Sequence, residues 1–72
     1  MRRRELMIYG PNGEVFPFCG VKADGKLLKF HIGGSWETVA KYSTKEKALE
    51  VQREIVTNYT ARLRSAYYVP AK

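Results

Sequence analysis

The most reactive side chains in this chain are one cysteine, Cys19, and one histidine, His31. Such residues can form a thiol–imidazole pair, in which the histidine deprotonates the thiol and the thiolate acts as a nucleophile. The sequence does not favour that pairing, because Cys19 follows Pro17 in an expected edge strand and His31 lies on the outer face of another expected strand. We therefore expect no catalytic residue and no enzymatic activity.

Metal and phosphate chemistry also lack the residues that they need. One cysteine and one histidine cannot supply an ordinary Cys/His zinc site, and a lone cysteine excludes an intrachain disulfide. The Gly-Gly-Ser turn at residues 33–35 is unlike a P-loop, because a P-loop opens a helix and this turn opens a strand. The sequence predicts no metal ligand and no cofactor.

The surplus positive charge lies at the two ends of the chain. Thirteen lysines and arginines stand against 7 aspartates and glutamates, which gives a formal net charge of +6. The positive residues outside the neutral body, residues 5–60, are Arg2, Arg3, Arg4, Arg62, Arg64 and Lys72. Segregated, arginine-rich charge is typical of a surface that binds an anionic partner.

Three tyrosines, Tyr59, Tyr67 and Tyr68, lie among the C-terminal arginines. Guanidinium groups bind phosphate and tyrosine rings stack on bases, so Arg62, Arg64 and these tyrosines are candidate partner- or anion-binding residues. Alternatively, the tyrosines complete an apolar stripe or a dimer seam, and the arginines offset the dipole at a helix C-terminus. The N-terminal arginines either bind phosphate as an arm or are only solvated.

Residues 5–42 alternate short apolar runs with turn signals, as antiparallel strands do. The Asn-Gly and Asp-Gly pairs at residues 12–13 and 24–25 predict hairpin turns. Because Pro17 has no N–H group, its strand is an edge, or it bends near Gly20 before it continues through Val21. Four strands are expected, at residues 6–9, 15–23, 26–32 and 36–42.

A helix follows, with Ser43 and Glu46 as its capping box. It begins at Thr44 and, continued to Tyr67, is roughly 35 Å long at 1.5 Å per residue. A strand of five to seven residues spans about 17–24 Å, so the last helical turns should overhang the sheet. The alternative is that the helix frays near Thr60 and the tail folds back over the sheet.

The overhang predicts a homodimer. Leu63, Ala66 and Tyr67 would lack a cover within their own chain, and small domains often gain stability from association. Two-fold symmetry would make this patch self-complementary.

The expected core combines one face of the sheet with the apolar stripe of the helix. Its members are Leu6, Ile8, Phe16, Phe18, Leu28, Phe30, Ile32, Trp36, Val51, Ile55 and Tyr59. The opposite sheet face meets water, with a secondary apolar patch of Met7, Tyr9, Leu27 and Val39. The stripe leaves Thr57 and Asn58 on the solvent side of the helix.

The segment WETVAKYSTKEKALEVQREI, residues 36–55, resembles a group of small, largely uncharacterised proteins of Firmicutes and their phages. In that group a β-meander precedes a capped helix of the form Y-[ST]-[ST]-x-E-x-A-x-x-V-x-x-[IL]. The matching residues are Tyr42, Ser43, Thr44, Glu46, Ala48, Val51 and Ile55. The resemblance implies a sheet-plus-helix fold and a mobile-element setting, and no chemistry.

These patterns predict one α+β domain, residues 1–72, with a four-stranded antiparallel β-meander packed on one long C-terminal α-helix. Its parts are a basic arm at 1–4, the sheet at 5–42, the helix at 43–67 and a tail at 68–72. We expect a cytoplasmic location, because a single thiol suits a reducing compartment. The sequence also has no stretch that approaches the roughly 20 apolar residues needed to cross a bilayer.

The expected function is that of a small phage-type binding protein that occludes another protein, such as a host defence effector. The alternative is a basic module that binds nucleic acid or a phosphorylated nucleotide through its arginine-rich ends.

Overall fold

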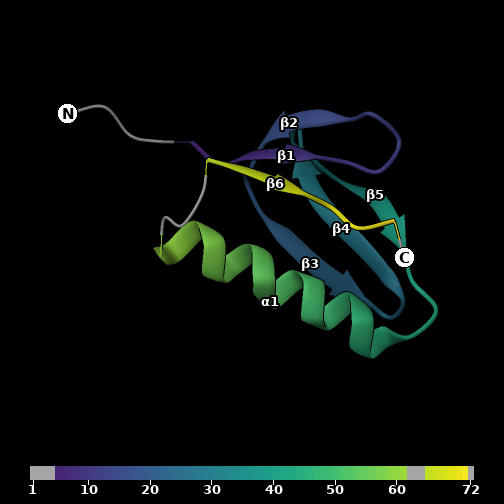
Figure 1. The fold of residues 1–72 in the computed structure, drawn as a ribbon. Coiled ribbons are helices and arrows are strands. Elements are labelled where there is room, and N and C mark those ends of the chain that lie inside the picture. Colours follow the sequence, from purple (N-terminus) through teal and green to yellow (C-terminus); the bar gives the residue numbers. More distant parts are fainter. Residues whose placement is uncertain (1–4, 62–64, 72) are drawn as a thin grey trace.

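The computed structural model describes residues 5–61 and 65–71, and it confirms the α+β class. The elements are β1 (Met7–Tyr9), β2 (Val15–Pro17), β3 (Val21–Asp24), β4 (Leu27–Ile32), β5 (Ser35–Lys41), α1 (Lys45–Ala61) and β6 (Ala66–Tyr68). Strands β1 to β5 come before the helix and β6 follows it (Figure 1).

The strands form two sheets instead of one four-stranded meander. The first sheet has the order β2-β1-β6 and the second the order β3-β4-β5. Neighbouring strands are antiparallel, except that β6 runs parallel to β1. The expected meander is therefore found only in the second sheet, and the first hairpin belongs to the other sheet.

The chain passes from one sheet to the other at Cys19 and Gly20. The Phe18 N–H donates to Leu6 O at 2.8 Å in the first sheet, and the His31 N–H donates to Gly20 O at 3.0 Å in the second. Backbone pairing thus continues up to the bend on both sides. The prediction that this segment bends near Gly20 before it continues through β3 agrees with the structure.

The helix covers the open edge of β3. The Gln52 side-chain oxygen accepts a hydrogen bond from the Ala23 N–H at 3.1 Å, so one outward-facing amide of this edge is paired by a helix side chain. Figure 1 shows α1 beside β3, with the two sheets above it. An edge covered in this way is protected from pairing with another chain.

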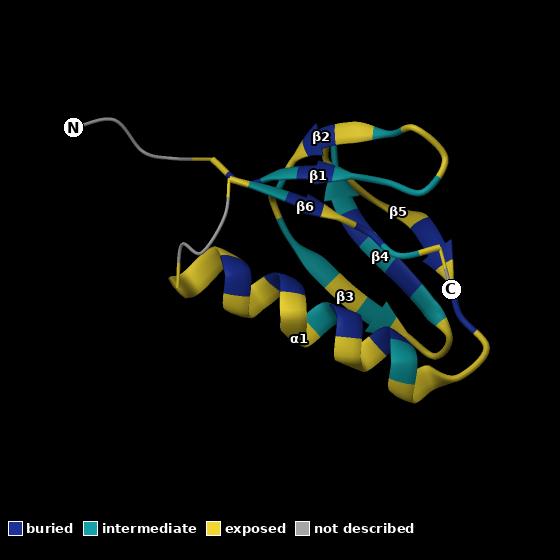
Figure 2. Cartoon of the chain, in the orientation of Figure 1, coloured by how far each residue is buried: buried dark blue, intermediate teal, exposed yellow. Residues whose placement is uncertain are grey.

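The core lies between the two sheets and α1, where Figure 2 shows the buried residues of the strands and of the helix. Its buried apolar residues are Leu6, Ile8, Phe16, Leu28, Phe30, Val39, Ala40, Tyr42, Ala48, Val51, Ile55, Tyr67 and Val69, with Phe18 and Ile32 partly buried against them. Most of the predicted core is confirmed, but Trp36 and Tyr59 are exposed.

A β-bulge explains why Trp36 is outside the core. Leu28 pairs with Ala40, yet Lys29 pairs with Thr38, so Val39 is an extra residue in β5. One extra residue reverses the alternation of side chains along the strand. Ala40 therefore points inward while Trp36 lies on the outer face, and Val39, predicted on that outer face, is buried.

The helix ends sooner than its apolar pattern predicted. Its described part ends at Ala61, and Ala66–Tyr68 form β6, so the predictions of a helix to Tyr67 and of an overhang are wrong. The alternative, a tail that folds back, agrees with the structure. The Met7 N–H donates to Ser65 O at 2.8 Å and the Val69 N–H donates to Tyr9 O at 2.9 Å. These bonds satisfy the edge of β1, and the tail buries apolar side chains that an overhang would expose.

The buried stripe of α1 continues through Asn58 rather than Tyr59. Ala48, Val51 and Ile55 are buried as predicted, but Asn58, expected in solvent, is also buried. Its side-chain N–H donates to Glu54 O at 2.9 Å. Both residues fit the spacing after Ile55, so the pattern alone did not distinguish them.

The helix cap differs from the prediction by one residue. The Thr44 hydroxyl oxygen accepts from the Lys47 N–H at 3.1 Å, and the helix begins at Lys45. Thr44 is therefore the N-cap, and the predicted cap at Ser43 is wrong. Both residue types can cap, so composition did not decide between adjacent positions.

Replacing Thr44 with Ala should lower the free energy of unfolding by about 0.5–2 kcal/mol, because first-turn amides lose their acceptor. Ser43→Ala is the matched control and should leave stability nearly unchanged. Urea denaturation followed by circular dichroism measures both variants. If Ser43→Ala is instead the more destabilising change, this cap assignment is wrong.

Tyr42 joins the end of β5 to the C-terminal tail. The ring is buried, and its hydroxyl donates to Pro70 O at 2.8 Å. Burial raises the pKa of Tyr42 above its usual value of 10.0, because the phenolate would lose solvation. The folded state therefore holds this proton more tightly than the unfolded state does. Its contribution to stability is intact below about pH 10 and is lost as pH rises through the folded-state pKa.

Tyr42→Phe should cost about 0.5–1.5 kcal/mol at neutral pH, the contribution of one neutral hydrogen bond. It should also make the alkaline loss of stability less steep, because the buried phenol no longer ionises. Urea unfolding at about pH 7 and at about pH 11, either side of the tyrosine pKa, tests this. Tyr68→Phe, at an exposed tyrosine, is the control, and an identical alkaline slope in wild type and Tyr42→Phe would contradict the assignment.

Candidate functional site

All of the basic residues predicted at the two ends lie outside the part of the chain that the structure describes. These are Arg2, Arg3, Arg4, Arg62, Arg64 and Lys72, and Leu63 of the predicted dimer interface also lies outside it. The described residues that follow the two arginine-bearing segments are Glu5 and Ser65. Because β1 and β6 are parallel, these two residues lie at the same end of the first sheet.

The three predicted tyrosines do not form one group. Tyr59 is on α1, with its ring centroid 4.9 Å from that of Phe18. Tyr67 is buried, and its hydroxyl donates to the Glu54 carboxylate. Tyr68 is 69% exposed and stacks on Tyr9 with 4.7 Å between the ring centroids.

The two described residues of the predicted dimer interface, Ala66 and Tyr67, do not share a face. Ala66 and Tyr67 are neighbours in a strand, so their side chains point to opposite sides of the sheet. Tyr67 pairs with Ile8 in register and belongs to the core, so it is unavailable to a partner. The two side chains separate because this segment is a strand, in which neighbouring side chains alternate between faces, and not the helix that was predicted.

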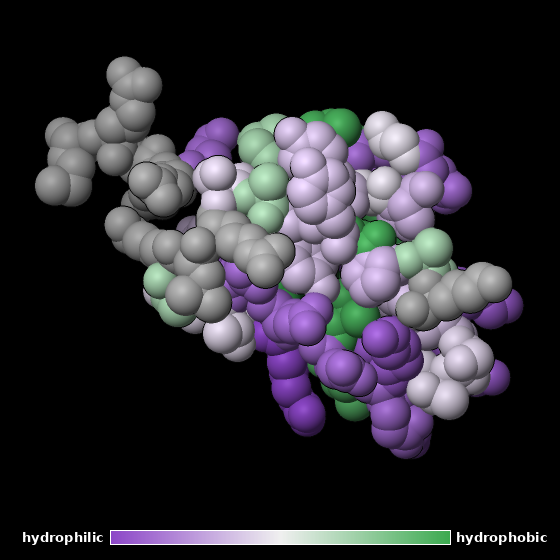
Figure 3. Space-filling view, viewed as in Figure 1, coloured by the Kyte–Doolittle hydropathy of each residue, from purple (hydrophilic) through white to green (hydrophobic). Residues whose placement is uncertain are grey.

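The outer face of the first sheet is continuous and apolar. In register, Tyr9 lies between Val15 and Tyr68, and Met7 lies between Pro17 and Ala66. We call this set the apolar face; its residues are Met7, Tyr9, Val15, Pro17, Ala66 and Tyr68. None of them carries a charge, and Val15 is 54% exposed. Figure 3 shows mostly pale and green surface over β1, β2 and β6, with deeper purple over α1.

Part of this face could be predicted from the sequence. Met7 and Tyr9 belong to the predicted secondary patch and lie on the apolar face, but Leu27 is in the second sheet and Val39 is buried. The contribution of Tyr68 and Ala66 could not be found from local pattern, because it depends on the pairing of β6 with β1.

A second group of side chains lies on the outer face of the second sheet. We call it the Trp36 cluster, and it consists of Trp36, His31 and Lys22. The Trp36 ring is 43% exposed, and the Lys22 Nζ lies 4.6 Å from its centroid. The His31 ring meets the tryptophan edge to face, with 5.1 Å between centroids. Regular alternation along residues 36–42 places Trp36 in the core, so this group is not predicted as an exposed surface.

Cys19 and His31 are the candidate residues for nucleophilic chemistry. Cys19 is a free, exposed thiol, and the His31 ring packs against Trp36. Within residues 5–61 and 65–71, no three His, Cys, Asp or Glu side chains gather closely enough to hold a metal ion. In the same residues, the one helix is too short and too polar to span a membrane.

Comparison with protein-family models, with curated proteins and with solved structures finds no match to this chain. The apolar face and the Trp36 cluster are therefore the features from which a function can be inferred.

Proposed function

We propose that this chain is a non-enzymatic protein-binding module that acts by occluding a partner protein. The apolar face of the first sheet carries this proposal. Six uncharged side chains from three paired strands form one surface there, and two of them, Val15 and Tyr68, are more than half exposed. Contiguous apolar surface of this kind marks interaction sites in soluble domains.

The chemistry of the face favours a protein partner with an uncharged, apolar surface. Phosphate and carboxylate ligands need cationic or N–H donors, and the six side chains of the face offer none apart from tyrosine hydroxyls. The stacked pair of Tyr9 and Tyr68 is ordered before binding, since the two rings already contact each other. Tyrosines are enriched in interface hot spots for this combination of large area and few rotatable bonds.

The biological setting follows the resemblance of residues 36–55 to small proteins of Firmicutes and their phages. In that setting the partner is a host protein, such as a defence effector, and binding blocks its active surface. The single free thiol at Cys19 fits a cytoplasmic location. A homodimer formed through the apolar face is the alternative to this proposal, and the experiments below distinguish the two.

A second candidate function is the binding of nucleic acid or a phosphorylated nucleotide. It is favoured by a separate observation, the exposed tryptophan with a lysine over its ring.

Tyr68→Asp should leave the fold intact, because Tyr68 projects into solvent, and should weaken partner binding at least tenfold by placing a charge within the apolar face. Val56→Asp is the matched control: it also adds a carboxylate at an exposed apolar side chain, on α1. The partner is recovered from native host cells, identified, purified and titrated against each variant by calorimetry.

Equal affinity of wild type and Tyr68→Asp would contradict the proposal. Sedimentation of the purified chain is the second measurement. A wild-type dimer that Tyr68→Asp converts to a monomer would show that the face binds a second copy, and the occlusion of a different protein by this face would then be wrong.

A further inference from the structure

We propose that the Trp36 cluster binds a nucleobase that carries a phosphate, within a single strand of nucleic acid. This site is on the second sheet and shares no residue with the apolar face, so the inference rests on the second candidate function and not on protein binding. A single strand and a free nucleotide both offer a planar base beside an anionic phosphate. The free nucleotide is therefore the other possible ligand of this site.

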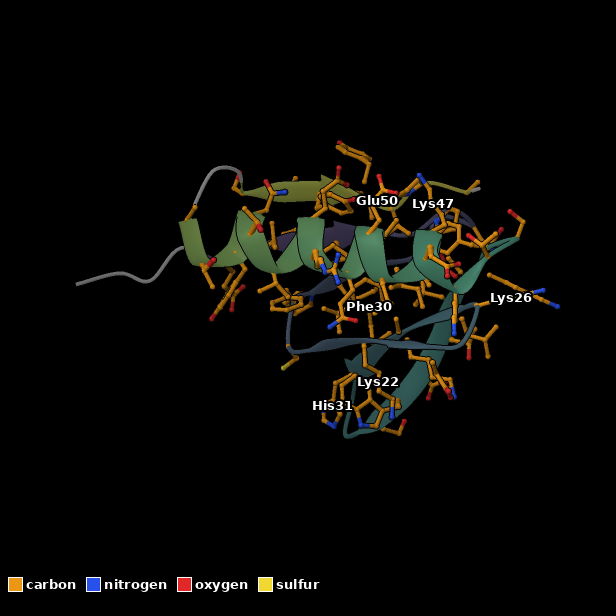
Figure 4. The ribbon with its side chains drawn as sticks, turned by 90° about the horizontal axis from the view of Figure 1, so that it is seen from below. Lys22, Lys26, Phe30, His31, Lys47 and Glu50 are labelled. Carbon is orange, nitrogen blue, oxygen red and sulfur yellow. The ribbon has the colours of Figure 1, made fainter. Side chains whose placement is uncertain are left out.

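The sheet register builds the site from three strands. His31 and Trp36 are paired across β4 and β5, and Lys22 of β3 is paired with Lys29 of β4. Figure 4 shows Lys22 and His31 on the side of the sheet away from α1, whereas Lys47 and Glu50 lie on the helix. The cluster therefore stands on a rigid surface that neither the helix nor the core uses.

The position of the tryptophan is not explained by packing. Full burial of a large apolar side chain contributes about 1.5–3 kcal/mol, yet Trp36 remains 43% exposed. Gly20 lies beside the indole, since a methyl group there would be in ordinary contact with the ring at 3.4 Å. The His31 ring, at 73° to the indole, limits its rotation. The result is a partly exposed aromatic ring on which a base can stack once the Lys22 side chain moves aside.

The charges around the ring suit a phosphate. Lys22 Nζ is held over the indole by a cation–π contact, and a side chain of that length can move its ammonium group to a phosphate beside a stacked base. Lys29 forms an ion pair with Asp24 at 3.2 Å, the acidic side chain that faces this part of the sheet from β3. The Asp24 carboxylate is thereby paired with Lys29 and not with Lys22.

An aromatic ring combined with lysine is the usual means by which proteins bind single strands without sequence preference. Stacking contributes about 1–3 kcal/mol per base, and each phosphate contact makes affinity depend on salt. The apolar face of the first sheet has tyrosines but no cationic side chain. Among the described residues, an exposed aromatic ring and a lysine over it occur together at Trp36.

The test uses the single tryptophan of the chain, since its fluorescence reports this site alone. The full chain is titrated with an oligodeoxythymidylate about eight nucleotides long, within the span that one small domain covers. We expect saturable quenching that weakens as salt increases. Trp36→Ala should reduce affinity about 5- to 150-fold, measured by anisotropy of a labelled oligonucleotide.

Lys22→Gln should weaken binding and lower the magnitude of the log–log salt slope by about 0.7, the value for one lost phosphate contact on a single strand. Lys26→Gln is the matched control, because it removes the same charge at the turn between β3 and β4, away from Lys22 and His31 (Figure 4). Circular dichroism checks that each variant is folded. Both lysine variants keep Trp36, so they remain informative if Trp36→Ala does not fold.

Three results would overturn the inference. The first is the absence of quenching. The second is binding that Trp36→Ala leaves unchanged, which would assign the contact to another part of the chain. The third is an equal effect of Lys22→Gln and Lys26→Gln.

A second titration uses thymidine monophosphate in place of the oligonucleotide. Quenching at the same affinity as the oligonucleotide would show that the ligand is a free nucleotide and not a strand. Tyr68→Asp should retain oligonucleotide binding, which separates this site from the apolar face.

Discussion

The parallel pairing of β6 with β1 is the interaction on which both the core and the apolar face depend. It brings a segment after the helix back to the first strand, where Met7 and Val69 donate backbone hydrogen bonds on either side of β6. The strand period then sends Tyr67 inward onto Ile8 and Tyr68 outward onto Tyr9. The pairing of β6 with β1 therefore closes the core and completes the surface that we assign to partner binding.

Much of the fold could be predicted from the sequence, because strands β1 to β5 and the body of α1 are specified by local signals. The alternation that includes Leu28 and Phe30 predicts buried strand residues from the local sequence alone. The spacing of Val51 and Ile55 does the same for the helix. The division into two sheets was only partly visible. Pro17 and Gly20 indicated a bend, but which strand pairs with which is set by contacts far apart in the chain.

The candidate sites were harder to predict, since each depends on a long-range or irregular feature. Tyr67 and Tyr68 were grouped because a helix was expected, and a strand separates them to opposite faces. Trp36 was placed in the core because regular alternation was assumed, and the bulge at Val39 reverses it. A bulge leaves no clear mark in a single sequence, because Thr, Val and Ala are all acceptable in either register.

The two surfaces suit different ligands because their electrostatics differ. The apolar face carries no formal charge, so a protein that docks there need not desolvate an ion, which is a large cost at buried interfaces. The Trp36 cluster keeps a lysine in solvent beside an aromatic ring, and such a lysine gains from an anion without prior burial. Each face belongs to a separate sheet with its own backbone pairing. A substitution on one face should then leave the other nearly unaffected, because side chains that share no partner contribute almost additively.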